Sequence, residues 1–361
     1  MSKPLLIAND LVKSFPVSGG GNQARFRAVD GVSLSVDRGK TLAVVGESGC
    51  GKSTVGSLLL RLQDADSGHI LLDGEDALAL DRAGLRRFRR RVQVVFQDPF
   101  ASLDPRERIR DVLVRPMLLH GLCDRATALK RAAELMDAVG LSATQLERFP
   151  HQFSGGQRQR IAIARALSVQ PDLIICDEPV SALDVSVQAQ VVNLLQDLQR
   201  DTGVAFIFIS HDLAVVRHLA HDVAVMYAGR VVERAVTTEL FGNPYHPYTR
   251  ALLAAAPRID VGAKGHALLA GEPPDPANPA PGCRFAGRCP HAQPSCTAGD
   301  QPPLSAVVPG HLSACLFARD LPPFAEAQSN AAHTPAALRV AAYRRARDRE
   351  ARSGDAEGLR T

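Results

Sequence analysis

The stretch LAVVGESGCGKST, residues 42–54, decides the fold. An apolar strand-like run, Leu42–Val45, leads into a glycine-rich turn with the spacing G-x-x-x-x-G-K-S, and a helix-compatible run, Thr54–Leu62, follows it. Glycines let successive backbone N–H groups turn inward on one anion, and the following helix points its positive end at the same anion. The stretch therefore predicts a phosphate-binding loop (P-loop) between a strand and a helix.

The chemistry of such a loop gives each of its residues an expected role. We expect the Lys52 ammonium group to reach the β- and γ-phosphates of a nucleotide and the Ser53 hydroxyl group to ligate Mg²⁺. Cys50 stands where the pattern accepts many residues, so we expect only a tolerated small side chain there. The residues of this stretch expected around the nucleotide are Gly46, Glu47, Ser48, Gly49, Cys50, Gly51, Lys52, Ser53 and Thr54.

Two acidic residues end a second apolar run, Leu173–Cys176. Carboxylates at the end of a buried strand are costly unless a cation lies beside them, and Mg²⁺ would supply that charge. We expect Asp177 to help hold the metal through water and Glu178 to polarise the attacking water as a general base. Taken alone, the pair fits two surface acids that cap a strand equally well. His211 follows a third apolar run, Ala205–Ile209, and we expect it to contact the γ-phosphate.

Length, charge and cysteine content limit the class of protein. The 361 residues suffice for one large α/β domain with an appendage, and a formal net charge of +4 gives no argument for a nucleic-acid partner. No apolar run has the length that a bilayer span needs, and residues 1–10 lack the pattern of a signal peptide. Seven cysteines in such a chain indicate reduced thiols or metal ligands. We therefore expect a cytoplasmic protein that reaches a membrane only through a partner.

The pattern along the chain predicts three parts. Residues 1–242 alternate strand-like and helix-like runs, which favours a parallel sheet covered on both faces, and the mostly helical pattern of residues 98–170 predicts a helical subdomain inserted between its strands. From residue 243 the composition shifts to proline and small residues, so 243–325 are expected to form a loop-rich appendage. Residues 326–361, rich in alanine and arginine, are expected to be a poorly ordered basic tail.

A further motif separates this chain from other P-loop proteins. Residues 153–160, FSGGQRQR, resemble the signature of ABC-type ATPases, and a helix-like run, Ile161–Ser168, follows them. A serine hydroxyl group, glycine N–H groups and a helix N-terminus again suit an anion. The resemblance implies that this motif closes over the γ-phosphate held by the P-loop of a second ATPase subunit, in a head-to-tail dimer with two ATP molecules between the subunits. The signature residues that it places at the nucleotide are Ser154, Gly155, Gly156 and Gln157.

Other elements of the ABC family match in order along residues 5–235. Gln97 resembles the loop glutamine that contacts Mg²⁺ and links the site to the helical subdomain, and Asp184 resembles the aspartate of the loop that crosses the dimer. Phe15 resembles the aromatic residue that stacks on adenine, with Phe26 as its competitor and a core phenylalanine as the other alternative. The resemblance implies a P-loop NTPase core of the α/β class with an antiparallel β subdomain, an inserted helical subdomain and a loop-rich C-terminal appendage, binding ATP and Mg²⁺.

Three stretches resemble the ATPase subunits of oligopeptide and dipeptide permeases: EPVSALDVSVQAQ at 178–190, NPYHPYTRALL at 243–253, and GEPP at 271–274 leading into GCRF at 282–285. FASLDPR at 100–106 is closer to the F-type of the two ATPases in those systems. The resemblance implies an importer of short peptides at the cytoplasmic face of the inner membrane. In it, this chain and a second, different ATPase subunit lie beneath two transmembrane permease subunits, fed by an extracytoplasmic solute-binding protein.

Other functions remain alternatives at this point. Nickel and glutathione importers use similar ATPases, so this chain does not fix the cargo. A soluble ABC ATPase of an assembly or metabolic complex, as in iron–sulfur biogenesis or phosphonate metabolism, is a second alternative. A scaffold that binds ATP without turnover is a third, and the presence of both Glu178 and His211 speaks against it.

Four of the seven cysteines lie in the appendage: Cys283, Cys289, Cys296 and Cys315. Their gaps are too wide for the usual zinc-binding pairs, while Pro290 directly after Cys289 is also found beside some cluster cysteines. Four thiolates can hold a [4Fe–4S] cluster, and some peptide-permease ATPases carry one here. A segment so poor in apolar runs would gain folding free energy from a metal. Zinc and unliganded thiols are the alternatives.

Overall fold

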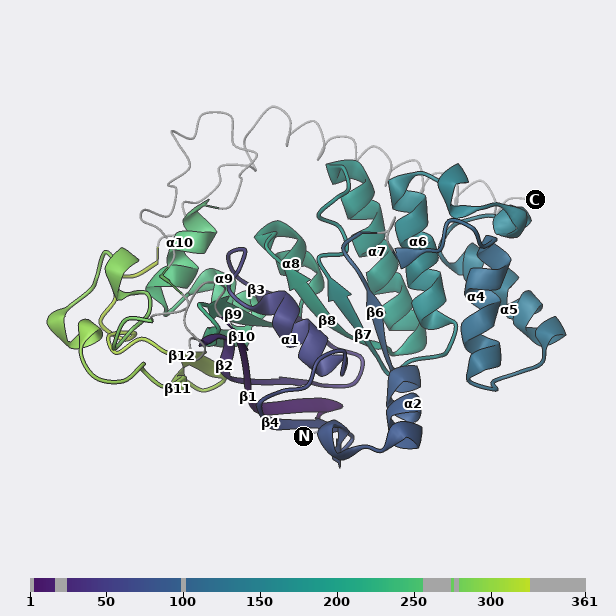
Figure 1. Ribbon diagram of the computed structural model, residues 1–361. Helices are drawn as coiled ribbons and strands as arrows, with labels where there is room; N and C mark the ends of the chain where they lie inside the picture. Colours follow the sequence, from purple (N-terminus) through teal and green to yellow (C-terminus); the bar gives the residue numbers. More distant parts are fainter. Residues whose placement is uncertain (1–2, 17–24, 99–101, 256–273, 276–278, 325–361) are drawn as a thin grey trace, which may run out of the picture.

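The computed structural model describes residues 3–16, 25–98, 102–255, 274–275 and 279–324 (Figure 1). The expected basic tail, 326–361, lies outside the described residues. The strands are β1 (Leu6–Pro16), β2 (Arg25–Val36), β3 (Thr41–Val45), β4 (Ser67–Leu72), β5 (Glu75–Asp76), β6 (Val92–Val95), β7 (Leu173–Asp177), β8 (Ala205–Ser210), β9 (Asp222–Tyr227), β10 (Arg230–Val236), β11 (Ser305–Val308) and β12 (His311–Ser313). The α-helices are α1 (Lys52–Leu59), α2 (Arg82–Arg91), α4 (Ile109–Leu119), α5 (Arg125–Ala138), α6 (Gly155–Leu167), α7 (Val185–Thr202), α8 (Leu213–Leu219), α9 (Thr237–Gly242) and α10 (Pro247–Ala255).

An eight-stranded sheet forms the centre of the molecule, in the order β11-β12-β10-β9-β3-β8-β7-β6. The strands from β9 to β6 are parallel, with β3 between β8 and β9. Both β3 and β8 are buried along their whole length, which is typical of parallel strands covered on both faces. Because parallel strands end at the same edge, the residues that follow β3, β7 and β8 meet there.

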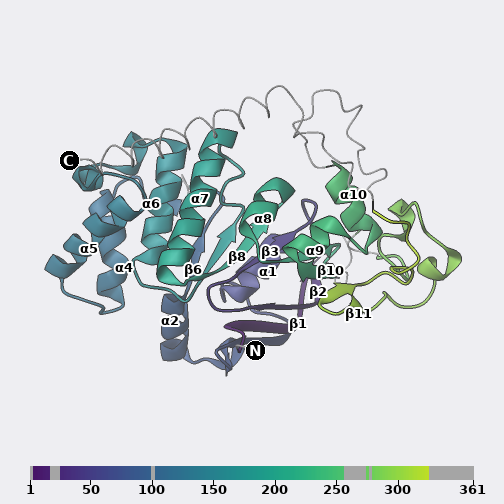
Figure 2. The ribbon, with the colours of Figure 1, turned by 180° about the vertical axis from the view of Figure 1, so that it is seen from behind.

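Alternate residues of the parallel strands contribute to two separate hydrophobic cores. Ala43 and Val45 belong to the core that includes α6, α7 and α8, which stand in a row along the sheet in Figures 1 and 2. Leu42 and Val44 belong to the second core, which includes α1 and the antiparallel strands β1, β2 and β4. Successive side chains of a strand point to opposite faces, so one continuous apolar run serves both cores.

A second, four-stranded sheet packs below the first, in the order β2-β1-β4-β5 with antiparallel pairing (Figure 1). It is the antiparallel β subdomain that the ABC resemblance implies. Because α1 lies between this sheet and the central one, the P-loop at the start of α1 has both sheets beside it.

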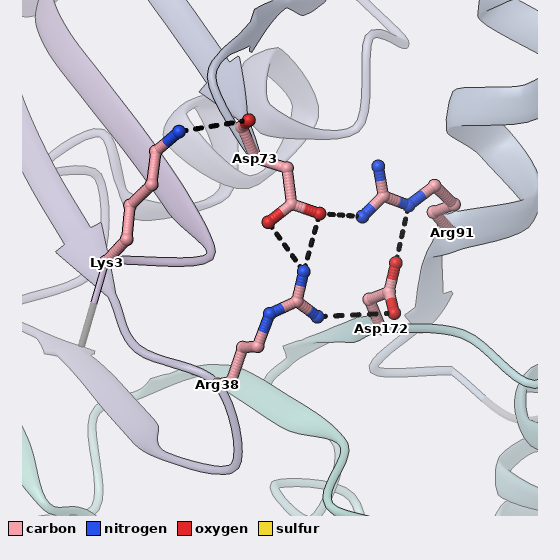
Figure 3. Close-up of polar contacts among 5 residues, drawn as sticks. All are labelled: Lys3, Arg38, Asp73, Arg91 and Asp172. Carbon is pink, nitrogen blue, oxygen red and sulfur yellow. Dashed lines mark hydrogen bonds and ion pairs between the residues drawn. The ribbon is translucent and has the colours of Figure 1, made fainter.

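A network of charged side chains joins the two sheets at the edge opposite the P-loop (Figure 3). Arg38, which precedes β3, binds Asp73 of the β4–β5 turn at 2.5 Å and lies 3.6 Å from Asp172, which precedes β7. Arg91, at the end of α2, binds both of these aspartates, and Lys3 donates to the Asp73 carbonyl oxygen. Two arginines between two aspartates leave each carboxylate with two cationic partners.

Helices α4, α5 and α6 form an insertion between β6 and β7, at the opposite end of the molecule from residues 279–324 (Figure 1). Asp124 begins α5 because its carboxylate accepts the Thr127 N–H. Apolar residues of α4 and α5 spaced three to five positions apart pack together and against α6. No helix among the described residues combines the length and the apolar character that a bilayer span requires.

Residues 279–324, here called the C-terminal module, continue the central sheet. β12 pairs with β10, and β11 pairs with β12, all antiparallel. Glu233 of β10 is completely buried beneath the module and accepts hydrogen bonds from the backbone N–H groups of Tyr245 and His246. His311 of β12 is the third partner of the Glu233 carboxylate, with its Nε2 atom 2.7 Å away. The module is therefore joined to the rest of the fold by a sheet and a buried carboxylate.

We predict that Glu233→Ala lowers the free energy of unfolding by about 3 kcal/mol, because it leaves three buried polar groups without their acceptor. Chemical unfolding of the full chain followed by circular dichroism measures this loss. Glu239→Ala, at an exposed position of α9, is the control, with an expected change within about 0.5 kcal/mol. Equal losses for the two variants would contradict the structural role of Glu233.

Candidate nucleotide site

The P-loop runs so close to two strands that two of its positions admit only glycine. Gly46 has a φ of 156° and Gly51 a φ of 104°, and a Cβ atom on either would lie 2.2 Å from a backbone carbonyl oxygen. The oxygen is that of Met226 in β9 for Gly46 and that of Ala28 in β2 for Gly51. The glycine spacing in the sequence thus has a steric cause, and the loop is fixed by its neighbours before any ligand binds.

The loop places a cationic group and free helix amides around one point. The Lys52 Nζ atom donates to the Gly46 carbonyl oxygen at 2.8 Å and to the Glu47 carbonyl oxygen at 2.9 Å, so the ammonium group lies inside the turn. Helix α1 begins at Lys52 after Gly51, and no described side chain caps its first N–H groups. Uncapped amides at a helix N-terminus, next to an ammonium group, form an anion site.

Ser53 and Asp177, both expected near Mg²⁺, meet at the carboxyl edge of the sheet. The Ser53 hydroxyl group donates to Asp177 Oδ1 at 3.1 Å. Burial raises the pKa of Asp177, and the charge of Glu178 raises it further, while the bond from Ser53 opposes the shift. Two neighbouring carboxylates beside a hydroxyl group offer the oxygen ligands that a hard divalent cation prefers.

Glu178 and His211 come together from the ends of β7 and β8. His211 Nδ1 lies 3.2 Å from Glu178 Oε2, and the Glu178 N–H group donates to the Ile209 carbonyl oxygen. Glu178 has a φ of 49°, in the left-handed region that side chains other than glycine, asparagine and aspartate rarely occupy. The strained backbone aims the carboxylate at the edge of the sheet beside Asp177, where the sequence predicts a water-polarising base.

The signature motif packs against the start of α7. Ser154 begins α6 in a capping box: its hydroxyl group accepts the Gln157 N–H, and the Gln157 side chain accepts the Ser154 N–H. A Cβ atom on Gly156 would lie 2.3 Å from Val187 Cγ1, whereas one on Gly155 would lie 3.6 Å from Leu183. Gly156 therefore allows the close packing of α6 on α7.

Two other expected residues, Asp184 and Gln97, lie in loops beside the site. Asp184 begins α7, where its carboxylate accepts the Val187 N–H, so it has a local capping role as well as the expected one. Gln97 is exposed directly after β6. The preceding carbonyl oxygen, of Phe96, accepts a bond of 3.4 Å from buried Gln159 of α6, which joins this loop to the helical insertion.

The two candidates for adenine stacking lie next to each other. Phe15 and Phe26 are directly opposite in the β1–β2 pairing, their ring centroids are 5.8 Å apart, and both are half-buried. The expectation for Phe15 therefore extends to a pair of rings, of which either can present a face to the base.

Sequence reasoning missed two residues that reach the P-loop from the far end of the chain. The Tyr248 hydroxyl group accepts the Glu47 N–H at 2.8 Å, and Arg288 binds both Glu47 carboxylate oxygens at 2.7 and 2.9 Å. The motif at 243–253 contains both Tyr248 and His246. In the structure His246 donates its N–H to Glu233, and its Nδ1 accepts the Tyr248 N–H.

The four cysteines of the C-terminal module line one cavity, together with His246 and His291. Burial raises the pKa of Cys283 and Cys289, and it raises that of Cys315 to about 11, with the neighbouring thiols adding to each shift. Among the described residues, no three or more histidine, cysteine, aspartate or glutamate side chains are arranged to hold a single metal ion.

The fold and the site define a transporter ATPase of the ABC class. The family model for the ABC transporter matches residues 29–181, and the model for the oligopeptide/dipeptide transporter C-terminal region matches residues 232–296. The chain is 49% identical over 292 residues to the dipeptide transport ATP-binding protein DppF of Escherichia coli, covering 80% of this chain and 87% of that protein. It is 50% identical over 319 residues to a probable peptide ABC transporter ATP-binding protein of Sinorhizobium fredii, covering 87% and 90%. The chain belongs to the family of ATP-binding proteins of dipeptide and oligopeptide ABC transporters.

Solved structures of ABC ATPases share the fold. The dimeric, post-hydrolysis structure of the ATP-binding cassette MJ0796 bound to ADP and Pi matches with a TM-score of 0.58 and 27% identity, over 64% of this chain and 98% of that one. A Clostridium perfringens protein, cbiO1, part of an ABC transporter complex, matches with a TM-score of 0.58 and 28% identity, over 66% and 91%. The α/β fold class predicted from the sequence is thus confirmed, and this chain is an ATPase.

We predict that Gly156→Ala lowers the free energy of unfolding by about 2 kcal/mol, because the added Cβ atom would overlap the side chain of Val187. Thermal unfolding of the full chain measures the effect. Gly155→Ala is the matched control one residue away, where the added atom meets Leu183 at an ordinary distance and the expected change is within about 0.5 kcal/mol. If the two variants unfold at the same temperature, the close packing of α6 on α7 is not what selects glycine at this position.

Proposed function

We propose that this chain hydrolyses ATP to power the import of short peptides through an ABC permease. One observation carries the proposal. The residues expected to bind and hydrolyse ATP, from Lys52 to His211, lie at the carboxyl edge of the central sheet, and a C-terminal module of the oligopeptide/dipeptide type extends that same sheet. The relatives named for dipeptide and peptide transport, at 49% and 50% identity, support the peptide class of cargo.

Each residue of the edge has a proposed role. Lys52 and the uncapped amides of α1 hold the β- and γ-phosphates, and Ser53, Asp177 and Gln97 hold Mg²⁺, which supplies positive charge against the developing negative charge of the phosphates. Glu178 orients and deprotonates the attacking water, because its carboxylate is fixed by the strained backbone next to the metal residues. His211, in contact with Glu178, positions the γ-phosphate.

We propose that the working unit is a heterodimer of this chain with a second ABC ATPase. The signature residues from Ser154 to Gln157 would close over the nucleotide on that subunit, and Asp184 would lie at the dimer interface. Their position at the start of α6, beside the exposed N-terminus of α7, supports this arrangement. The dimeric state of the related cassette with ADP and Pi also supports it.

We further propose that the dimer lies at the cytoplasmic face of the membrane, beneath two permease subunits that receive cargo from an extracytoplasmic solute-binding protein. The contact between Gln159 and the Phe96 carbonyl oxygen gives a route by which nucleotide contacts at Gln97 reach the helical insertion. Movement of that insertion with the closing dimer would drive the permease between its two states.

We predict that Glu178→Gln, in the assembled transporter, retains ATP binding but lowers ATP hydrolysis by about 100-fold or more, because the glutamine cannot accept the proton of water. ATP-driven uptake of labelled dipeptides into vesicles should fall in parallel, and the closed dimer should accumulate with ATP. Glu134→Gln, on the exposed face of α5, is the matched control and should leave both rates unchanged.

Two results would contradict these proposals separately. Hydrolysis by Glu178→Gln at the wild-type rate would exclude Glu178 as the base. A chain that purifies without membrane subunits, and whose ATPase rate does not respond to peptide and solute-binding protein, would exclude peptide import and favour a soluble assembly ATPase.

We propose that the four cysteines of the C-terminal module hold a [4Fe–4S] cluster. All four thiols line one cavity, and backbone N–H groups of Phe285, His291 and Phe317 point at three of the sulfur atoms. Such N–H bonds stabilise thiolates in cluster sites. A cluster takes one thiolate at each of four iron atoms, and that wider spacing suits a cavity where no described group fits a single ion.

We predict that chain purified without oxygen contains about four iron and four sulfide per chain and absorbs in the visible range. Cys289→Ser should lower the iron content, whereas Cys123→Ser, outside the module, should leave it unchanged. Colourless protein with stoichiometric zinc would establish a zinc site instead, and metal-free protein would establish unliganded thiols.

A further inference from the structure

The second residue of the P-loop is held by the C-terminal module. Arg288 binds the Glu47 carboxylate through two nitrogen atoms, at 2.7 and 2.9 Å, and only 6% of its side chain is exposed, against 25% for Glu47. The hydrogen bond to Glu47 raises the pKa of Arg288 above its usual value. The two residues are 241 positions apart in the sequence, so this bidentate pair is a tertiary contact between the ATP site and the module.

An aromatic cluster holds the pair in place. Tyr227, at the end of β9, lies with its ring centroid 4.5 Å from that of Tyr248 and 5.3 Å from that of Phe285. Arg288 lies over the Tyr227 ring and donates to its hydroxyl group at 3.3 Å, while the Tyr248 hydroxyl group accepts the Glu47 N–H. Both the backbone and the side chain of Glu47 are therefore fixed from outside the loop.

The charge on Glu47 is the reason that this contact matters for nucleotide binding. Glu47 belongs to the loop that encloses the triphosphate, and a carboxylate without a partner there would repel the phosphates over a distance shorter than the screening length of physiological salt. A guanidinium group paired in a bidentate way offsets that charge and fixes the orientation of the carboxylate.

We propose that Arg288 is a positioning residue of the ATP site: it neutralises Glu47 and so sets the affinity of the P-loop for the triphosphate. Arg288 ends a short 3₁₀ turn, and the next residue, Cys289, donates its N–H to the Ala286 carbonyl oxygen of the same turn. The conformation of the module around Cys289 therefore determines the position of the Arg288 guanidinium group.

The test measures ATP and ADP dissociation constants for the full-length chain in its assembled transporter, with a fluorescent nucleotide. Arg288→Met should weaken ATP binding about tenfold, equal to about 1.4 kcal/mol, and weaken ADP binding less, because ADP carries less charge. The double variant Glu47→Gln with Arg288→Met should return to within about threefold of the wild-type affinity, because no uncompensated carboxylate is left.

Two further variants separate charge from folding. Arg288→Lys keeps the positive charge but loses the bidentate geometry, so we expect ATP affinity within about threefold of wild type. Arg319→Met removes another arginine of the module, whose side chain donates to the Val307 carbonyl oxygen, and should not change nucleotide affinity. Thermal unfolding of every variant reports on the fold independently.

The proposal is overturned if Arg288→Met binds ATP as tightly as wild type. It is also overturned if the double variant binds as weakly as Arg288→Met alone, because the arginine would then act only through the fold. Equal weakening of ATP and ADP binding, or weakening by Arg288→Lys as large as that by Arg288→Met, would likewise exclude charge neutralisation.

Discussion

The structure depends on one steric and electrostatic constraint: backbone N–H groups and an ammonium group must surround a single point at the carboxyl edge of the sheet. Gly46 and Gly51 meet this constraint only because β9 and β2 press carbonyl oxygens against them, so the loop needs the central sheet and the antiparallel sheet together. The Lys52 ammonium group then lies inside the turn, where it donates to the Gly46 carbonyl oxygen. Without either sheet the loop would lose the neighbours that fix its donors, and α1 accordingly packs in the core between the two sheets, beside the fully buried β3.

The parallel strands bring the P-loop together with the other residues expected to act on ATP, at the carboxyl edge of the sheet. Since β3, β7 and β8 run side by side in register, Ser53, Asp177 and His211 arrive at the same edge from segments up to 158 residues apart. This arrangement has two costs: burial, with the charge of Glu178 added, raises the pKa of Asp177, and the backbone of Glu178 is held in the left-handed region. At the opposite edge, Arg38 and Arg91 lie between two aspartates, so cationic groups there already have partners. At the carboxyl edge, by contrast, Asp177 and Glu178 lie where a metal and a nucleotide would offset their charge.

Local patterns in the sequence predicted the P-loop, the acidic strand end and the alternation of the parallel strands, because these depend on residues within a few positions of each other. Contacts between distant segments left no such pattern. The sequence places Glu47 in the P-loop but gives no sign of Arg288 as its partner, because their pairing requires the C-terminal module to fold back onto β9 and β10. The short strands β11 and β12 were missed for a related reason: with three or four residues each, they exist because β10 offers an edge to pair with. The roles expected of Ser154 and Asp184 depend on a second subunit, so one chain displays only their local capping bonds.

The C-terminal module is better described as part of the ATPase than as an appendage to it. Its basic residues Arg284 and Arg288 are buried, and each is paired with an acid of the ATPase core, Asp30 and Glu47 respectively. Asp30 is itself 3% exposed and is shared with Arg27 and Arg230, while Glu233 is fully buried beneath the module. Buried charges of this kind are strongly destabilising when one partner is removed. Without the module, Glu47 would lose its arginine partner, Asp30 would lose one of three arginines, and Glu233 would lose its contact with His311. These shared contacts explain why the module extends the central sheet with its own strands.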